Sequence, residues 1–322
     1  MKTNRRDFLK NLGALALCSI ASSSEWAKAA IHTHKPTAMP HNATRHLTIL
    51  HTNDVHSHID PFPADDVQYA NLGGYARRKA YIDKVRNEGN ETLVFECGDM
   101  FQGTPYFNFY KGKLEISLMN QMGIDAVTLG NHEFDNGLDV LCDRIEEAQF
   151  PFINTNYNFT NQRAKQLIIP HKIFSKCGIR IGVFGLGIDG NGLITEANLQ
   201  GTTYTDPILV AQRTAHYLRH EQNCQMVIAL THIGYEMNST IDDKKLAAQT
   251  SGIDLILGGH SHTFLPEPVI IKNKEGHDVV INQVGFGGIN VGRIDVLISN
   301  DPNNAKNNKL ITLNGAYPHI VS

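Results

Sequence analysis

Five short blocks of Asp, Asn and His residues have the types and spacing of metal ligands. In the first, Asp54-Val55-His56, alternate side chains of an extended chain point the same way, so the Asp54 carboxylate and the His56 imidazole could contact one cation. In the second, Asp99 follows Gly98 and is a candidate bridging ligand, because an anionic oxygen can stabilise two neighbouring positive charges. Taken alone, each pattern is more typical of a loop hydrogen bond or a turn.

The third block, residues 130–135, reads GNHEFD and is more specific. Asn131 can offer its amide oxygen to a metal, which leaves His132 free to point toward a substrate. Asp135 is three residues further on, within reach of the other nitrogen of the His132 ring. A carboxylate there would fix the tautomer and favour the protonated ring, as a general acid requires. Glu133 is expected to be structural.

The last two blocks contain the remaining histidine candidates. His232 ends an apolar run, and residues 258–262 read GGHSH, so that His260 and His262 again alternate to one side. The two glycines allow a tight backbone turn over a metal cluster. A lone His at a strand end is usually a hydrogen-bonded polar residue, but five blocks in sequence predict a metal site. His58 is expected at the rim or on the surface.

Buried strands must position these blocks, because each block directly follows an apolar run. Polar loops and amphipathic helical stretches separate the runs, and this alternation favours a mixed α/β sheet with the active-site loops at the strand ends. The expected strands are residues 47–50, 92–95, 126–129, 152–153, 181–184, 226–230 and 253–257. The expected helices are residues 74–87, 114–122, 138–147, 207–221 and 242–249.

The C-terminal part of the chain changes character. Residues 269–272, 279–284 and 292–298 are short β-type runs joined by turns rich in Gly and Asn. Such a pattern is typical of antiparallel strands joined by tight turns. A second, more antiparallel sheet is therefore expected there.

Composition and charge narrow the function classes. The 322 residues are 41% hydrophobic and 19% charged, which is ordinary for one large globular domain. With 29 Lys and Arg against 32 Asp and Glu, the net charge is −3. This excludes a basic field that holds a nucleic-acid polymer but leaves small anionic substrates. Sixteen His are unusual and favour metal binding.

The N-terminal residues predict export. Arg5 and Arg6 precede Phe-Leu-Lys, an apolar run over residues 12–21 and the small-residue stretch 27–29. We interpret residues 1–29 as a twin-arginine signal peptide, 30–45 as a flexible lead and 46–322 as the catalytic domain. The apolar run is shorter than the roughly 20 residues of a membrane span. A periplasmic or secreted protein without a stable membrane anchor is expected.

Two alternatives for the N-terminus stay open. A basic and apolar start also suits the general secretory route, and Cys18 would suit a lipoprotein except that Leu17 precedes it. The other cysteines lack any C-x-x-C pair, and we expect them to be mostly buried thiols: Cys97, Cys142, Cys177 and Cys224.

With GNHEFD and GGHSH in this order, the sequence resembles the calcineurin-like metallophosphoesterase superfamily, within it the 5′-nucleotidase and UDP-sugar hydrolase branch, over residues 47–298. The resemblance implies a four-layer α/β/β/α sandwich of two mixed sheets flanked by helices. It also implies His132 and Asp135 as a catalytic dyad. The implied metal sites are Asp54, His56, Asp99 and His262 for one, and Asp99, Asn131, His232 and His260 for the other.

The resemblance implies hydrolysis of a phosphate ester, with two cations holding the phosphate and the attacking hydroxide and with Asn131 and His132 on its oxygens. Ligands without thiolates suit Mn²⁺, Zn²⁺, Fe or Co²⁺. A 5′-nucleotidase-type phosphomonoesterase is the first expectation. A cyclic-nucleotide or UDP-sugar phosphodiesterase is the second. A non-catalytic metal-binding or partner-binding subunit is the third, disfavoured because a scaffold needs no oriented acid.

The sequence departs from this branch at its C-terminal end. Its larger members carry a further domain with paired aromatics for the base and arginines for the phosphate, whereas residues 300–322 contain Tyr317 as the only candidate ring. Poor discrimination among bases is therefore expected. A separate C-terminal nucleotidase-type chain could supply the missing contacts.

Overall fold

The structure is a computed structural model that describes residues 44–237, 241–299 and 311–320, the last stretch by its backbone alone. The expected signal peptide, most of the expected lead and the Tyr317 side chain lie outside this description. Within the described residues, no helix combines the length and the apolar character needed to cross a membrane.

The strands form two large sheets and a small one. In the seven-stranded sheet, five neighbouring strands run parallel to one another. Two further strands, joined by antiparallel pairing, complete the sheet at one side. Its order is β15 (Ile311–Ile320), β14 (Asn290–Ser299), β1 (Thr44–Thr52), β2 (Glu91–Glu96), β3 (Ala126–Thr128), β4 (Phe152–Ile153) and β6 (Ile168–Ile169).

The six-stranded sheet has four parallel central strands between two antiparallel edges. Its order is β12 (Val269–Lys272), β13 (Asp278–Asn282), β11 (Leu255–Leu257), β10 (Met226–His232), β8 (Ile179–Gly187) and β7 (His171–Lys176). The small sheet pairs β5 (Tyr157–Asn158) with β9 (Thr203–Tyr204).

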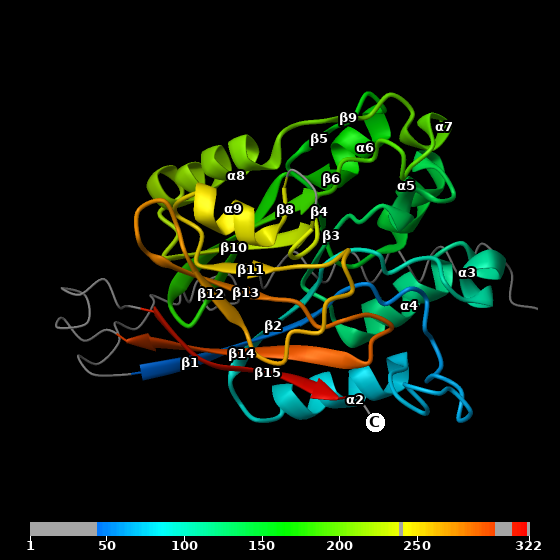
Figure 1. The fold of residues 1–322 in the computed structure, drawn as a ribbon, viewed down its shortest axis with the longest axis horizontal. Coiled ribbons are helices and arrows are strands. Elements are labelled where there is room, and N and C mark those ends of the chain that lie inside the picture. The colour runs from blue at the N-terminus through cyan, green and yellow to red at the C-terminus, as the bar shows by residue number, and fades with distance from the viewer. Residues whose placement is uncertain (1–43, 238–240, 300–310, 321–322) are drawn as a thin grey trace, which may run out of the picture. The chain divides into compact units, whose positions relative to one another are not determined.

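Helices cover the outer face of each large sheet, as Figure 1 shows. The first sheet carries α2 (Tyr75–Arg86), α3 (Pro105–Tyr110), α4 (Lys113–Met122), α5 (Leu138–Glu147) and α6 (Gln162–Leu167). The second carries α8 (Pro207–His216), which continues as the π-helical turn η3 (Tyr217–Glu221), and α9 (Asp243–Gln249). Two short elements complete the description: η2 (His132–Phe134) and α7 (Glu196–Leu199).

Three separate hydrophobic cores match the three interfaces of a four-layer sandwich. In β1, Ile49 packs between the two sheets whereas Leu50 packs against the helices of the first. In β10, Ile228 packs between the sheets whereas Val227 packs against α8 and α9. Strands buried on both faces are apolar at successive positions, which is why the sequence shows them as continuous runs. The predicted α/β/β/α sandwich is confirmed.

The predicted elements agree closely with the structure, with one correction. All the expected strands and helices fall on observed ones, although the helix expected over residues 207–221 becomes π-helical after His216. The prediction that the C-terminal strands form a second, more antiparallel sheet among themselves is wrong. β12 and β13 complete the six-stranded sheet, and β14 pairs with β1 in the other. Val296 and Ile298 of β14 face the core between the sheets, so pairing with β1 buries them and covers a sheet edge.

The cysteine prediction is confirmed for the described residues. Cys97, Cys142, Cys177 and Cys224 are buried free thiols. None of the four therefore needs an oxidising compartment for its role in packing.

Candidate metal centre

All five ligand blocks lie at the carboxyl ends of strands. Asp54 follows β1, Asp99 follows β2 and Asn131 follows β3 in the first sheet. In the second sheet His232 is the last residue of β10, and His260 follows β11. Parallel strands bring their carboxyl ends to one edge of a sheet. The five blocks of the two stacked sheets therefore lie together at a common site.

The backbone at the candidate ligands is strained. The φ angles are 51° at Asp54, 49° at His56, 54° at Asp99, 78° at His260 and 52° at His262. Left-handed conformations of residues other than glycine cost about 1–3 kcal/mol each and cluster at functional sites. Here the loops hold one another, because the N–H groups of Asp54 and His56 donate to the carbonyls of Gly98 and Asp99, both at 3.0 Å.

The first ligand group contains Asp54, His56 and His262, whose candidate ligand atoms all lie within 4.8 Å of one another. The Nε2 atoms of His56 and His262 are 2.9 Å apart. Asp54 Oδ1 lies 3.3 Å from His262 Nε2, and the Asp54 side chain is fully buried. Three ligand atoms converging on one point are what a single cation requires.

The second group contains Asp99, His232 and His260 under the same 4.8 Å limit. Asp99 Oδ2 lies 3.0 Å from His232 Nε2. Asn131 joins this group, because its Oδ1 lies 3.0 Å from His260 Nδ1. The structure thus brings together all seven candidate metal ligands that the sequence indicated, as two adjacent groups.

The donor atoms of the second group fit a divalent cation. His232 Nδ1 lies 2.8 Å from the Cys97 carbonyl, to which it donates, so Nε2 of the neutral ring has a free lone pair. This buried Nε2 faces Asp99 Oδ2 at 3.0 Å. Burial lowers the pKa of His232, but the Asp99 and Asp54 carboxylates outweigh it and raise the pKa to about 10.

The predicted dyad is formed. His132 Nδ1 lies 2.8 Å from Asp135 Oδ2. This hydrogen bond raises the pKa of His132, against the opposing effect of burial. The His132 backbone N–H donates to Asp99 Oδ1 at 2.9 Å, which ties the dyad to the second ligand group. The imidazole is therefore oriented, protonated more readily than a free histidine, and next to the candidate metal site.

Glu133 has the structural role expected of it. Its buried carboxylate accepts the N–H groups of Gly130 at 2.6 Å, Asp99 at 2.9 Å and Met100 at 2.9 Å. The loops after β2 and β3 are thereby fixed to each other. Gly130 is required for the same close approach, because a Cβ there would overlap the Asp99 carboxylate.

A cavity of about 340 Å³ opens onto the ligands. Asp54 and His232 lie fully buried beneath it. His58, expected at the rim, is half-buried in the wall and stacks on Phe62 at 4.4 Å. The wall also contains residues that no sequence pattern indicates, namely Gln102, Gly103 and Phe286. The other lining residues are His56, Asp99, Asn131, His132, His260 and His262.

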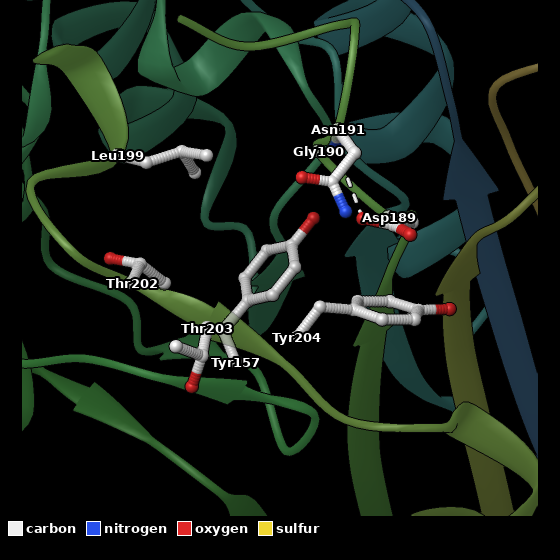
Figure 2. A pocket seen from close by; sticks show the side chains of 8 residues that line it. All are labelled: Tyr157, Asp189, Gly190, Asn191, Leu199, Thr202, Thr203 and Tyr204. Atoms are coloured by element: carbon white, nitrogen blue, oxygen red, sulfur yellow. Dashed lines mark hydrogen bonds between the residues drawn. The ribbon is translucent and has the colours of Figure 1, made fainter. Parts of the chain in front are cut away.

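A second cavity, of about 310 Å³, has different chemistry. Figure 2 shows the rings of Tyr157 and Tyr204 inside it and Asp189 beside Asn191 at one end. The Tyr157 hydroxyl donates a hydrogen bond to the carbonyl of Ile188 at 2.6 Å. Burial raises the pKa of both tyrosine hydroxyls. Asp189 is its single carboxylate, and no histidine lines it. The candidate metal ligands and the oriented His132 therefore lie at the first cavity and not at this one.

Comparisons with known proteins agree with this geometry. The model of the calcineurin-like phosphoesterase family matches residues 47–264. The 5′-nucleotidase of Rattus norvegicus is 31% identical over 289 residues, covering 83% of this chain and 49% of the relative. The trifunctional nucleotide phosphoesterase protein YfkN of Bacillus subtilis is 31% identical over 282 residues, covering 78% of this chain and 18% of the relative.

A solved structure shows the same likeness. The 5′-nucleotidase precursor from Thermus thermophilus superposes with a TM-score of 0.76 at 30% identity, covering 86% of this chain and 54% of that one. This chain thus spans about half the length of these nucleotidases. The family match includes the GNHEFD and GGHSH segments whose side chains meet at the cavity. The chain therefore belongs to the calcineurin-like phosphoesterase family, whose members are metal-dependent phosphoester hydrolases.

Proposed function

We propose that the chain is an exported phosphomonoesterase of the 5′-nucleotidase type that works with two divalent cations. The observation that carries the proposal is one cavity onto which both ligand groups and the oriented His132 open. The nucleotidase names of the relatives support a nucleotide as the small phosphate-ester substrate.

The proposed ligand sets follow the two observed groups. Asp54, His56 and His262 would hold one cation, and Asn131, His232 and His260 the other. Asp99 would bridge them. Carboxylate, amide and imidazole donors without thiolates suit Mn²⁺, Zn²⁺, Fe or Co²⁺.

The side chains divide the catalytic work. When bound, the cations would neutralise phosphate charge and make water a competent nucleophile near neutral pH. Asn131 and His132 would stabilise the equatorial phosphate oxygens. Asp135 holds Nδ1 of His132, so the proton for the leaving oxygen comes from Nε2 of that ring. Release of this proton as the ester bond breaks would avoid an unstable alkoxide.

A second candidate is a phosphodiesterase that acts on cyclic nucleotides or UDP-sugars. The trifunctional nucleotide phosphoesterase among the relatives favours it, because its name assigns more than one activity to that protein. The third candidate, a non-catalytic metal-binding subunit, would leave the His132 and Asp135 pair without a purpose.

Metal analysis of the purified protein, coupled to a substrate panel, separates these candidates. We expect two metal ions per chain and phosphate release from nucleoside 5′-monophosphates. Cleavage of 2′,3′-cyclic AMP or UDP-glucose without phosphate release from AMP would favour the phosphodiesterase. Full metal content without turnover of any ester would favour the non-catalytic subunit.

The double substitution Arg5→Lys and Arg6→Lys should block export and leave the precursor in the cytoplasm. The export receptor recognises the two arginines themselves, so lysines that only keep the positive charge should not replace them. Cell fractionation measures this, with Lys28→Arg as the control in the same segment. Periplasmic delivery of the double variant that stops when the general secretory route is blocked would contradict the twin-arginine proposal.

The chain alone should hydrolyse AMP, GMP, CMP and UMP with similar efficiency. The proposed ligands and His132 contact only the phosphate, which all four share. Kinetics on the purified chain measure this, and a preference beyond about 100-fold, about 2.7 kcal/mol, would reveal a base-specific pocket within residues 47–298.

We also propose that a separately encoded chain, resembling the further C-terminal part of the longer nucleotidases, could supply base contacts. Its addition should lower KM and sharpen selectivity, because contacts remote from the phosphorus add binding energy. Unchanged kinetics after its addition would count against such a partner.

A further inference from the structure

Four aromatic rings pack together beside the metal centre and form what we call the aromatic cluster: Phe62, Tyr69, Phe264 and Phe286. The Phe286 ring is central, with centroid distances of 5.3 Å to Tyr69, 5.8 Å to Phe264 and 6.0 Å to Phe62. The rings come from three loops, after β1, β11 and β13. The fold assembles this cluster from distant parts of the sequence.

The aromatic cluster is continuous with the metal centre. Phe286 lines the cavity and stacks on the ring of the candidate ligand His262, with 5.1 Å between centroids and 18° between planes. On the other side of the cluster, Phe62 stacks on His58, which also lines the cavity. A ligand anchored by its phosphate at the cations would therefore meet aromatic carbon at the cavity wall.

The backbone fixes the central ring relative to the ligands. Asn53 donates to the Gly285 carbonyl at 2.6 Å and accepts the Val284 N–H at 3.0 Å. The Gly287 N–H donates to the carbonyl of Asp54 at 2.7 Å. Since Asp54 is a candidate ligand, these hydrogen bonds tie the loop that carries Phe286 to the metal centre.

Two glycines let the outer rings lie directly on this loop. Gly285 and Gly287 have φ angles of 86° and 62°. A Cβ at Gly287 would be 2.7 Å from the Phe62 ring, and one at Gly285 would overlap the Phe264 ring. The cluster is thus preorganised, which reduces the entropy lost when a ligand binds.

The cluster is not a closed core. Phe264 is 37% exposed, and the other three rings are partly exposed. Tyr69 and Phe264 also stack on each other, with 6.0 Å between centroids and 18° between planes. Partly exposed aromatic rings next to the cavity suit a planar, weakly polar group, and a nucleobase is such a group. Stacking is tolerant of base identity because every base has a π face.

We propose that the aromatic cluster is the stacking surface for the base of the nucleotide substrate, beginning at Phe286, which lines the cavity, and continuing to the more exposed Phe264. This inference rests on the proposed nucleotidase function and deepens it. The surface distinguishes nucleotides from phosphate esters without a base, and it does not distinguish one base from another. It is compatible with similar rates for AMP, GMP, CMP and UMP.

The decisive comparison is AMP against ribose 5-phosphate, which has the same primary phosphate ester and lacks only the base. We expect kcat/KM of the metal-loaded protein to be about 5- to 150-fold higher for AMP, the range that base stacking on an aromatic ring provides. Phe264→Leu and Tyr69→Leu keep apolar bulk but remove the ring, so each should lower the AMP to ribose 5-phosphate ratio. Phe264→Trp should restore it.

Phe109→Leu is the matched control, because Phe109 is an exposed ring of α3 outside the cluster, and it should leave the ratio unchanged. Adenosine binding to the metal-free protein, followed by calorimetry, gives a readout independent of turnover. It should weaken in Phe264→Leu and recover in Phe264→Trp. Unfolding midpoints show whether each variant is folded.

The outcomes separate this inference from the proposed function. Phosphate release from both esters, with a ratio near one or a ratio that neither Leu variant changes, would overturn the base-stacking role and leave the phosphatase intact. The cluster would then be a surface for a protein partner or a packing feature. No phosphate release from any ester by the metal-loaded protein would overturn the proposed function and, with it, this inference.

Discussion

His132→Ala should retain both metal ions and lose about 10²- to 10⁴-fold in turnover, the usual contribution of a general acid or base. The His132 side chain is absent from both three-residue ligand groups, and its Nδ1 is engaged by Asp135 at 2.8 Å. Removing the ring would therefore remove the proposed proton donor and one proposed phosphate contact without removing a member of either ligand group. Steady-state kinetics and elemental analysis on the same preparation measure the two effects.

Asp135→Ala should lose less turnover than His132→Ala, because the ring remains and only its orientation and its raised pKa are lost. His277→Ala is the control, since His277 is an exposed histidine on the turn between β12 and β13 and should keep full turnover. If His132→Ala released metal but kept the same turnover per bound metal, His132 would be a ligand and the dyad assignment wrong.

The ligand blocks could be predicted because each is short and follows its own strand. Alternation along an extended chain predicts that Asp54 and His56, and likewise His260 and His262, share a face. These residues instead have left-handed φ angles, and the two histidines of the second pair belong to different ligand groups. The dyad was predictable from a spacing of three residues. The structure adds that these loops take left-handed conformations, with φ of 51° at Asp54 and 78° at His260. Residue types do not reveal such strain, because tertiary contacts impose it.

The aromatic cluster could not be predicted for a related reason. Phe62, Phe264 and Phe286 lie in three loops with no periodic pattern, and only pairing of the strands brings those loops together. Residues 300–322, where the resemblance places the base contacts of longer relatives, contain Tyr317 as the only candidate stacking ring. The stacked rings beside the cavity come from other loops.

The sheet assignment of the last strands failed because alternation identifies a strand but not its partner. β14 has the apolar alternation of Ile294, Val296 and Ile298, which any half-buried strand would show. Its place beside β1 follows from the free edge that the parallel strands leave. The fold class was nevertheless predictable, because the doubly buried parallel strands are continuous apolar runs.

Asp99→Asn should weaken both metal sites, whereas Asp54→Asn or His262→Ala should weaken mainly the first. Asp99 Oδ2 lies 3.0 Å from His232 Nε2 in the second group, and its Oδ1 accepts the His132 N–H at 2.9 Å. The neutral amide keeps the size of the side chain but removes the negative charge that would balance two cations. Loss of a shared anionic ligand should lower the metal affinity further than loss of a residue that only hydrogen-bonds a ligand. Removal of such a hydrogen-bonding residue lowers metal affinity roughly 10- to 100-fold.

Two measurements on Asp99→Asn test the bridge. Elemental analysis should show both metals reduced, and added metal should raise the unfolding temperature less than in the unsubstituted protein, because the stabilisation depends on the ratio of metal concentration to Kd. Asp278→Asn is the matched control, since Asp278 is an exposed carboxylate of β13 that pairs with Lys272. If Asp99→Asn retained both metals at full occupancy, Asp99 would not bridge them. If it lost only the metal held by His232 and His260, Asp99 would be a ligand of that site alone, as the observed grouping by distance permits.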